Sequence, residues 1–469
     1  MKKKITKKQY IKFSIAGILY GLFILWMQNG WLTLGYILLA DIYLTKYIPW
    51  GAWKNVKNPS LRNALGWVDD IVFALVAVYF INIFLFQNYQ IPSSSLEKSL
   101  LVGDYLFVSK ASYGPRVPNT PLSFPLVQNT LPILNCKSYL EWPEWGYKRV
   151  AGLGQVQRND IVVFNFPAGD TIALRMQNPD YYTLVEMYGR EAIRTNRQQF
   201  GEIMYRPVDK REHYVKRCIG MPGDTLSIRS NQVYINGEKA TNPKNMQLNY
   251  FVESETPFTE TMFRNWGVSK DDYMPYGQPC TVTDAETLSF LGFQPNANGN
   301  YNLVYRFPMT EAMLNQVKKL PSVKKVVVEP DIVGGTLYYP VDYKTGWTRD
   351  NYGPIWIPKR GATIELTPEN LAIYRRCIKN YEHNDLEEKD GVIYINGKPA
   401  TTYTFQYDYY WMMGDNRHNS ADSRSWGFVP EDHIVGKPIM IWLSLNKDRD
   451  WFDGKIRWER LFRWVDNIK

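Results

Sequence analysis

The sequence has few of the residues that build metal centres or disulfide frameworks. Its 469 residues include only four histidines and four cysteines: Cys136, Cys218, Cys280 and Cys377. The cysteines form no Cys-x-x-Cys and the histidines no His-x-x-His pattern. Structural metal sites draw their ligands from such close spacings, so we expect no metal and no cofactor.

Long runs of one charge are also missing. The formal net charge is +9, but the basic residues are spread thinly and form no run beyond Lys2–Lys4 and Lys7–Lys8. A nucleic-acid-binding protein gathers Lys and Arg into a patch, so nucleic acid is excluded as a partner. Aromatic residues, by contrast, make up 15 % of the chain. That abundance favours β-structure or a surface that faces a membrane.

Three apolar segments lie near the N-terminus, at residues 13–27, 31–44 and 71–86. Each is near or below the ~20 residues of a membrane-spanning helix. Lysines precede the first segment, and the 46–66 loop between the second and third is basic, whereas the link between the first two is uncharged. The positive-inside rule then predicts a cytoplasmic N-terminus, three crossings and an external chain after Phe86. Asp41 in the second segment is costly in a bilayer unless it is paired.

From Gln87 onwards the sequence is typical of antiparallel β-structure. Apolar and β-branched runs alternate with turn signals, at 105–108, 161–166, 214–219, 225–228, 233–235, 392–395 and 439–443. Asn236-Gly237 and Asn396-Gly397 each follow a strand and predict two-residue hairpins. One helix is expected after Thr367 and Pro368, with one apolar face of Leu371, Tyr374, Ile378 and Tyr381.

Four polar segments carry candidate chemistry, at 90–104, 158–167, 214–224 and 413–428. In this order they resemble the signature boxes of bacterial type I signal peptidases (leader peptidases), a family of Ser–Lys dyad serine proteases. The resemblance covers roughly 67–170, 205–240 and 391–445, about half of the chain.

The segment around the nucleophile departs from the family pattern at three places. The pattern is Pro-Ser-x-Ser-Met-x-Pro-Thr-Leu, and this chain has Pro92-Ser-Ser-Ser-Leu-Glu-Lys-Ser-Leu100. Leu96 and Ser99 are mild changes in volume. Lys98 in place of a proline is the largest departure, and we expect it to be a solvated side chain.

The resemblance implies that Ser95 is the nucleophile and Lys216 the general base. An ordinary lysine has a pKa of about 10.4, so about 1 in 2,500 is neutral at pH 7. Burial must therefore lower the pKa of Lys216, and its apolar, strand-like neighbours make burial plausible. Cys218, two residues later, would share that strand face as a buried thiol.

The resemblance also assigns supporting roles. The Ser93 hydroxyl and the Ser95 N–H would form the oxyanion hole, and Ser420 would exchange a hydrogen bond with Lys216. Asp422 and Arg424 match a supporting salt bridge. The turn that places Ser420 matches Gly414, Asp415, Asn416 and Arg417. Small apolar substrate pockets would be built from Ile91, Pro92, Leu96, Leu100 and Val215. Trp142 and Trp145 are equally consistent with a membrane interface and with a core.

We therefore expect a mostly β fold, with N-terminal transmembrane helices followed by an antiparallel β-sheet catalytic domain that carries a long inserted cap region. The expected parts are a membrane anchor (1–90), two parts of the catalytic domain (91–240 and 391–469) and a non-catalytic cap (241–390). The implied substrates are exported preproteins, cleaved after small-x-small sites at the outer face of the bacterial cytoplasmic (inner) membrane. The lipid bilayer and the secretion translocon are the other implied partners.

Two alternatives remain at this level. Ser95-Leu-Glu-Lys98 is also a Ser-x-x-Lys motif, and Tyr234-Ile-Asn236 and Lys344-Thr-Gly346 follow in the order of penicillin-binding transpeptidases. A catalytically silent, membrane-tethered binding protein is the other alternative. Which lysine reaches Ser95 discriminates between the two acyl-enzyme hypotheses.

Overall fold

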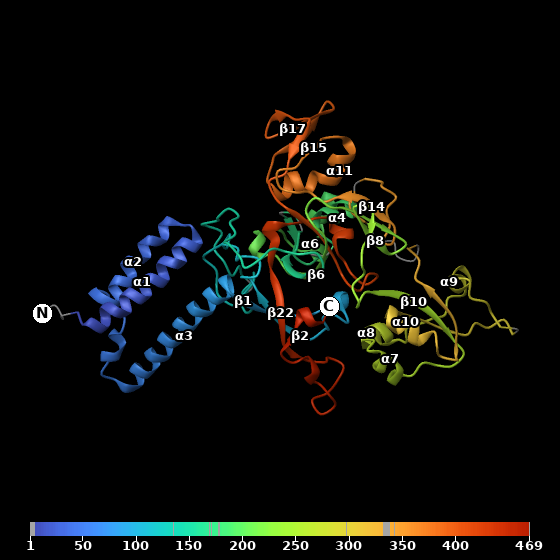
Figure 1. The fold of residues 1–469 in the computed structure, drawn as a ribbon, viewed down its shortest axis with the longest axis horizontal. Coiled ribbons are helices and arrows are strands. Elements are labelled where there is room, and N and C mark those ends of the chain that lie inside the picture. The colour runs from blue at the N-terminus through green and yellow to red at the C-terminus, as the bar shows by residue number, and fades with distance from the viewer. Residues whose placement is uncertain are drawn as a thin grey trace. The chain divides into compact units, whose positions relative to one another are not determined.

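The computed structural model describes residues 5–134, 136–167, 169, 171–176, 179–296, 298–331, 338–341 and 343–468. The chain divides into two compact units. The first comprises residues 1–87 and 110–154, and the second comprises 88–109 and 155–469. Figure 1 shows the order of their helices and strands.

The first unit contains the apolar helices. Among the described residues, α1 (Lys7–Met27) and α3 (Pro59–Phe84) are each long and apolar enough to cross a membrane. Thr6 caps α1 in a capping box with Gln9, and Asn58 caps α3 just before Pro59. These two predicted segments are confirmed as long apolar helices.

The middle apolar segment is shorter, at Gly30–Thr45. It consists of η1 (Gly30–Leu34), α2 (Gly35–Ala40) and η2 (Asp41–Thr45). Tyr36 of α2 donates to the Gly17 carbonyl of α1, so the two helices lie side by side (Figure 1). The Asp41 carboxylate is satisfied by hydrogen bonds from Thr45, Trp50 and two backbone N–H groups. Whether this segment crosses a membrane stays a prediction.

The rest of the first unit, residues 110–154, is mainly loop. Val117 and Val150 pack with Met27 and Phe84 in one apolar cluster. Trp142 is 83 % exposed and Trp145 is also exposed. Neither tryptophan is a core residue, and their place at a membrane interface stays a prediction.

The second unit is built on an antiparallel sheet, as expected. The strand order is β1-β2-β22-β3-β6-β20-β21, and β23 pairs with β22. The bounds are β1 (Phe86–Gln90), β2 (Asp104–Ser109), β3 (Ile161–Asn165), β6 (His213–Gly220), β20 (Tyr409–Met413), β21 (Val429–Pro430), β22 (Ile434–Ser444) and β23 (Arg463–Trp464).

Both predicted hairpins are confirmed. They join β8 (Gln232–Ile235) to β9 (Glu238–Lys239) and β17 (Val392–Ile395) to β18 (Lys398–Pro399). All four turn residues have positive φ, at 54° and 85° for Asn236-Gly237 and 52° and 75° for Asn396-Gly397. Only a type I′ turn requires positive φ at both central positions, which explains Asn-Gly at each. The preceding strands β7 (Thr225–Arg229) and β16 (Leu386–Lys389) pair with β8 and β17, respectively.

The expected insertion has two different parts. Residues 247–328 form a subdomain with its own sheet, in the order β11-β12-β10-β13, and short helices (Figure 1). Its elements are β10 (Gln247–Ser254), α7 (Glu260–Trp266), α8 (Lys270–Tyr273), β11 (Thr281–Val282), α9 (Ala285–Phe290), β12 (Leu303–Thr310), α10 (Glu311–Val317) and β13 (Val323–Val328). After it, β14 (Tyr352–Trp356) pairs with β7, so the chain rejoins the main core well before residue 390. A single cap over 241–390 stays a prediction.

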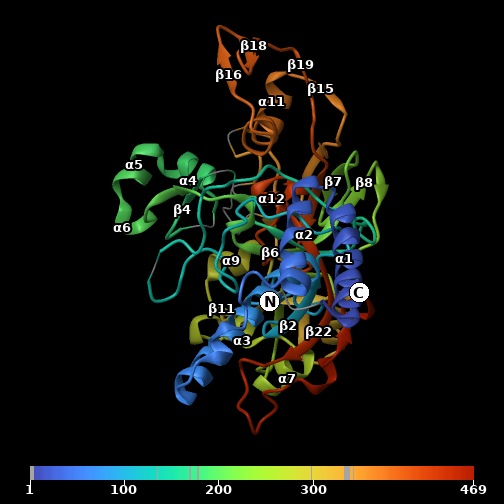
Figure 2. The same cartoon turned by 90° about the vertical axis from the view of Figure 1, so that its left-hand side faces the viewer.

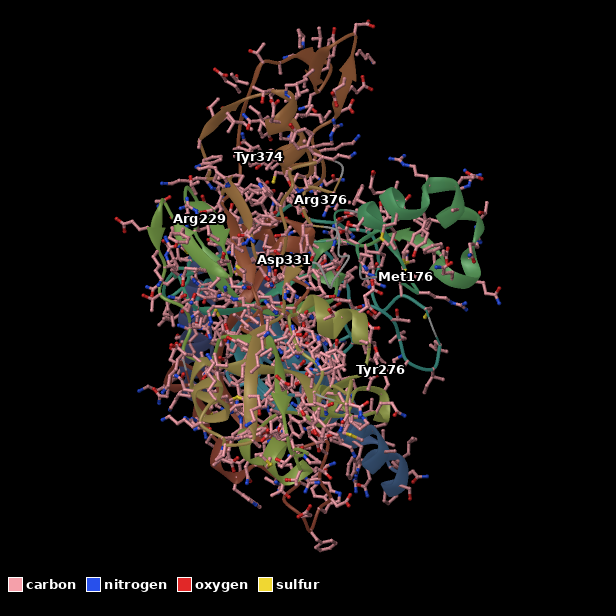
Figure 3. All side chains as sticks on the ribbon, turned by 90° about the vertical axis from the view of Figure 1, so that its right-hand side faces the viewer. Met176, Arg229, Tyr276, Asp331, Tyr374 and Arg376 are labelled. Atoms are coloured by element: carbon pink, nitrogen blue, oxygen red, sulfur yellow. The ribbon has the colours of Figure 1, made fainter. Side chains whose placement is uncertain are left out.

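The predicted helix near 367 is confirmed. Thr367 caps α11 (Pro368–Arg376), and η8 (Cys377–Tyr381) continues it. All four residues of its expected apolar face are buried: Leu371, Tyr374, Ile378 and Tyr381. Arg376, labelled in Figure 3, pairs at 3.2 Å with Asp180, the cap of α4 (Tyr181–Tyr188).

Helix α4 belongs to a small lobe with α5 (Arg190–Thr195), α6 (Arg197–Phe200), β4 (Thr171–Ala173) and β5 (Ile203–Tyr205) (Figure 2). The remaining strands and α-helices of the described residues are β15 (Thr363–Glu365), β19 (Thr402–Thr404) and α12 (Ser423–Trp426).

Candidate active site

Ser95 lies in a short loop between the first two strands of the main sheet. The loop closes because the Ile91 N–H donates to the Asp104 carbonyl and the Gly103 N–H donates to the Ile91 carbonyl, both at 2.9 Å. Ser95 occupies the single 3₁₀ turn η4 (Ser94–Leu96) and is 6 % exposed. We call residues 91–104 the nucleophile loop.

Lys216 reaches this serine from the central strand β6. Its Nζ donates to Ser95 Oγ at 2.6 Å, and the lysine is 4 % exposed. Burial lowers the pKa of Lys216 to about 8, although the carboxylates of Asp422 and Asp415 oppose that shift. Removal from water disfavours the ammonium, so a neutral amine becomes accessible near neutral pH.

A second buried group ties the nucleophile loop to the same strand. Arg217 donates through Nε and Nη2 to the two carboxylate oxygens of Asp415, at 2.7 and 2.6 Å. The Ser99 hydroxyl donates to the same carboxylate at 2.6 Å. Ser99 therefore keeps the hydroxyl that a threonine would supply. One carboxylate thus connects the loop, strand β6 and the turn that follows β20.

That turn also holds the backbone of Ser95. The Asn416 N–H donates to the Ser95 carbonyl at 3.1 Å, and its side-chain amide donates to the Ser94 carbonyl at 3.3 Å. A Cβ added to Gly414 would lie 2.6 Å from the Ser95 carbonyl oxygen and 2.3 Å from Ser420 Oγ. A glycine is required there because the turn approaches the loop so closely.

Asp422 and Arg424 form the expected salt bridge. Arg424 donates through Nε and Nη2 to the two Asp422 oxygens, at 2.9 and 2.8 Å, and both residues are fully buried. The Gly414 N–H also donates to Asp422, at 3.1 Å. The pKa of Asp422 is lowered because Arg424 outweighs the effect of burial. The pair fixes the segment that carries Ser420.

Ser420 is near the dyad but does not make the expected contact. In the described part of the chain its hydroxyl donates to the Ala421 carbonyl at 3.4 Å, and not to Lys216. Ser93 is exposed at the start of η4. The roles expected for these two hydroxyls stay predictions.

The expected substrate-pocket residues gather behind the nucleophile. Ile91, Leu96 and Leu100 are buried in one apolar cluster, and Val215 packs against it. Pro92 is exposed. Their role in substrate binding stays a prediction.

The expectation for Lys98 is wrong. Its side chain is half-buried, and its Nζ donates to the carbonyls of Trp266 and Gly267 at 2.8 and 2.5 Å. The lysine is drawn to the C-terminus of a helix that lies 168 residues away in sequence. It is Lys216, and not Lys98, that contacts Ser95. The transpeptidase alternative therefore loses the geometry on which it depends.

Two contributors to the site were missed. Arg217 has no role in the prediction from sequence, although a second basic residue in an apolar strand is a signal for a buried ion pair. His418 also lies in the turn, where Nδ1 accepts from the Asn249 N–H at 3.2 Å. Cys218, as predicted, is a buried thiol, and burial raises its pKa.

Comparison with known proteins identifies the family. The model described as "Signal peptidase, peptidase S26" matches residues 64–284 and 360–443. Signal peptidase I of Haemophilus influenzae is 24 % identical over 415 residues, which cover 87 % of this chain and 78 % of the relative. Signal peptidase I of Buchnera aphidicola from Acyrthosiphon pisum is 22 % identical over 392 residues (82 % and 77 %), and that of Helicobacter pylori 21 % over 415 (86 % and 92 %). The chain belongs to the signal peptidase family, peptidase S26, and is a serine endopeptidase.

Proposed function

We propose that this protein is a type I signal peptidase that removes signal peptides from exported preproteins through an acyl-enzyme on Ser95, with Lys216 as the base. The observation that carries the proposal is the 2.6 Å contact between Lys216 Nζ and Ser95 Oγ, because both side chains are withdrawn from water. A general base must lie within hydrogen-bond reach of the proton that it removes.

The electrostatics support Lys216 in this role. With a pKa of about 8, roughly one lysine in ten is neutral at pH 7, against about 1 in 2,500 for an ordinary lysine. Asp422 and Asp415 would favour the ammonium, but each carboxylate is bound by an arginine. The two ion pairs thus keep both carboxylates near Lys216 while limiting how far they raise its pKa.

The reaction proceeds in two stages. The neutral Lys216 amine takes the Ser95 proton while Oγ attacks the scissile carbonyl carbon. The resulting ammonium protonates the leaving amine as the C–N bond breaks, which leaves an ester on Ser95. Lys216, neutral again, takes a proton from the attacking water while its oxygen adds to the ester carbon. The ammonium then returns a proton to Ser95 Oγ as the ester C–O bond breaks, which releases the acyl product as a carboxylic acid and restores the enzyme. The Ser95 N–H and the Ser93 hydroxyl would donate to the oxyanion in both stages.

Substrate choice is proposed to follow from the apolar wall beside Ser95. Signal peptides end in small residues in a small-x-small pattern. The cluster of Ile91, Leu96 and Leu100, with Val215 against it, offers apolar surface to such side chains.

We also propose that the catalytic unit lies outside the cytoplasmic membrane, with α1 and α3 as anchors and the secretion translocon as a partner that delivers substrates. The basic residues around the apolar helices support this orientation. Cys136 is exposed, whereas the other three cysteines are buried. An impermeant thiol reagent should therefore label Cys136 in intact cells. Lys57→Cys in a Cys136→Ser background should stay unlabelled, and the opposite pattern would contradict the orientation.

Cleavage of a model preprotein tests the function itself. The purified full-length chain should cut after a small-x-small site, and Ser95→Ala should abolish cleavage. Ser94→Ala is the matched control, because it removes a neighbouring hydroxyl and should leave cleavage within about threefold. Activity in Ser95→Ala would refute the assignment of the nucleophile.

A further inference from the structure

The Lys98 side chain attaches the nucleophile loop to the 247–328 subdomain. Lys98, three residues after Ser95, donates to the carbonyls of Trp266 and Gly267. These carbonyls end α7, where helix carbonyls lack intrahelical partners and the helix dipole favours a cation. An ammonium with three donors suits two converging carbonyls.

Two acidic side chains act on the charge of Lys98, although burial lowers its pKa overall. Glu97 and Asp272 face it and oppose the lowering of its pKa by burial. The lysine thus lies at the contact between the loop and the subdomain, with carbonyl acceptors and two acidic side chains around it. A solvated surface lysine would have no such set of partners.

The backbone conformation of Lys98 explains why the loop needs a contact that restrains it. Its φ is 71°, in the left-handed region that non-glycine residues adopt only when the surrounding structure holds them there. The family pattern has proline at this position, but a proline ring fixes φ near −65°. A proline at position 98 is therefore incompatible with this loop conformation. The hydrogen bonds of the Lys98 side chain restrain the loop instead.

The same subdomain holds the other side of Ser95. The Gln247 N–H of β10 donates to the Asp415 carbonyl at 2.8 Å, and the Arg417 N–H donates to the Gln247 carbonyl at 3.0 Å. Asn416, which lies between Asp415 and Arg417 in the chain, donates its backbone N–H to the Ser95 carbonyl. The subdomain thus contacts both segments that meet at the nucleophile.

We propose that the 247–328 subdomain positions the active site, and that Lys98 is the positioning residue through which it fixes the nucleophile loop. The proposal rests on the proposed role of Ser95. A displacement of about 1 Å at a nucleophile can lower its rate about 100-fold. The subdomain then contributes to kcat without touching the substrate.

The chain contains a matched control within the same subdomain. Lys325 on β13 donates to the Gly292 and Leu291 carbonyls at 2.5 and 3.5 Å, just after α9. In the described part of the chain its side-chain hydrogen bonds and its cation–π contact are with Leu291, Gly292 and Phe293. Lys325→Met removes the same kind of contact but does not touch the nucleophile loop.

The experiment compares Lys98→Met, Lys98→Arg and Lys325→Met in the full-length enzyme, with a model preprotein as substrate. Lys98→Met should lower kcat about 10- to 100-fold and leave KM within about threefold. Lys98→Arg should recover most of the rate, because a guanidinium also donates to carbonyls. Lys325→Met should stay within about twofold of wild type.

Hydrogen exchange gives a readout that does not depend on catalysis. Peptides from 91–104 should exchange faster in Lys98→Met, whereas peptides from β6 should not change. Gly267→Ala disrupts the same contact through a change in the subdomain, because the added Cβ would lie 2.7 Å from Lys98 Nζ. It should reproduce the loss of kcat, and the double variant should be no worse than Lys98→Met.

A Lys98→Met enzyme with kcat within twofold of wild type, or with unchanged exchange in 91–104, would overturn the proposal. Equal losses in Lys98→Met and Lys325→Met would also overturn it, since the effect would then be one of stability. An active Ser95→Ala would instead refute the nucleophile, while the exchange experiment would still decide whether Lys98 holds the loop.

Discussion

Two lysines lie close to Ser95 in sequence or in space, and burial lowers the pKa of both. Lys216 meets a hydroxyl, which can accept from an ammonium or donate to a neutral amine. Lys98 meets two peptide carbonyls, which can only accept. The carbonyls therefore stabilise the charged form, whereas the hydroxyl tolerates either form.

The difference shows that withdrawal from water is not sufficient to make a base. The partner of the amine decides whether the neutral form is useful, and the position of the amine decides whether it reaches the proton. Lys216 satisfies both conditions, and Lys98 satisfies neither. The following predictions test this contrast, from the largest effect to the smallest.

Substitutions of Lys216 and Lys98 should give the largest difference in kcat. Lys216→Ala should lower kcat by about 10⁴-fold or more, since dyad residues act as a unit. Lys216→Arg should be equally inactive, because a guanidinium stays charged near pH 7. Lys98→Arg should remain active. Single-turnover cleavage of a model preprotein measures all three.

An active Lys216→Arg would contradict the assignment of the base. If Lys216→Arg and Lys98→Arg were both inactive, the proposed difference in role between the two lysines would be wrong. The double variant Ser95→Ala with Lys216→Ala should be no worse than either single variant.

Removal of the Ser93 hydroxyl should have an intermediate effect. If this hydroxyl donates to the oxyanion, Ser93→Ala should lower kcat about 10²- to 10³-fold with little change in KM. Ser93→Thr keeps the donor and should keep much of the activity. Steady-state kinetics decide, and an alanine variant within twofold of wild type would leave Ser93 without a catalytic role.

Burial of Lys216 should reduce stability in a defined pH range. Its folded-state pKa of about 8 lies below its ordinary value of 10.5. The protonated form therefore prefers the unfolded chain, so the penalty is complete below pH 8 and disappears as the pH rises toward 10.5. Lys216→Met should raise the free energy of unfolding by up to about 3 kcal/mol at pH 7, and less at pH 10.

Unfolding midpoints in detergent at the two pH values measure this effect. Lys437→Met is a useful control, because Lys437 is paired with Asp160 at 3.0 Å and its removal should bring no gain. A Lys216→Met enzyme that is less stable than wild type at pH 7 would contradict the burial penalty.

Much of the fold could be predicted because the signals were local. Asn236-Gly237 and Asn396-Gly397 demand positive φ, and Thr367-Pro368 starts a helix in any context. The pairing of Ser95 with Lys216 was implied by family resemblance, since no local rule brings together residues 121 positions apart.

The remaining features depend on long-range contacts. Lys98 was expected in water because the family pattern has proline at its position, and nothing nearby indicated that the end of α7 would reach it. Arg217 was given no role because its partner Asp415 lies 198 residues away. No local feature of the sequence predicts that residues 352–356 pair with β7.

The pH dependence of kcat tests the central claim most directly. If neutral Lys216 is the base for Ser95, kcat should rise about tenfold per pH unit below an apparent pKa near 8 and level off above it. Lys98→Arg should show the same profile. A profile that is flat from pH 6 to 10, or one that levels off near pH 6.5 as for an ordinary histidine, would contradict the account.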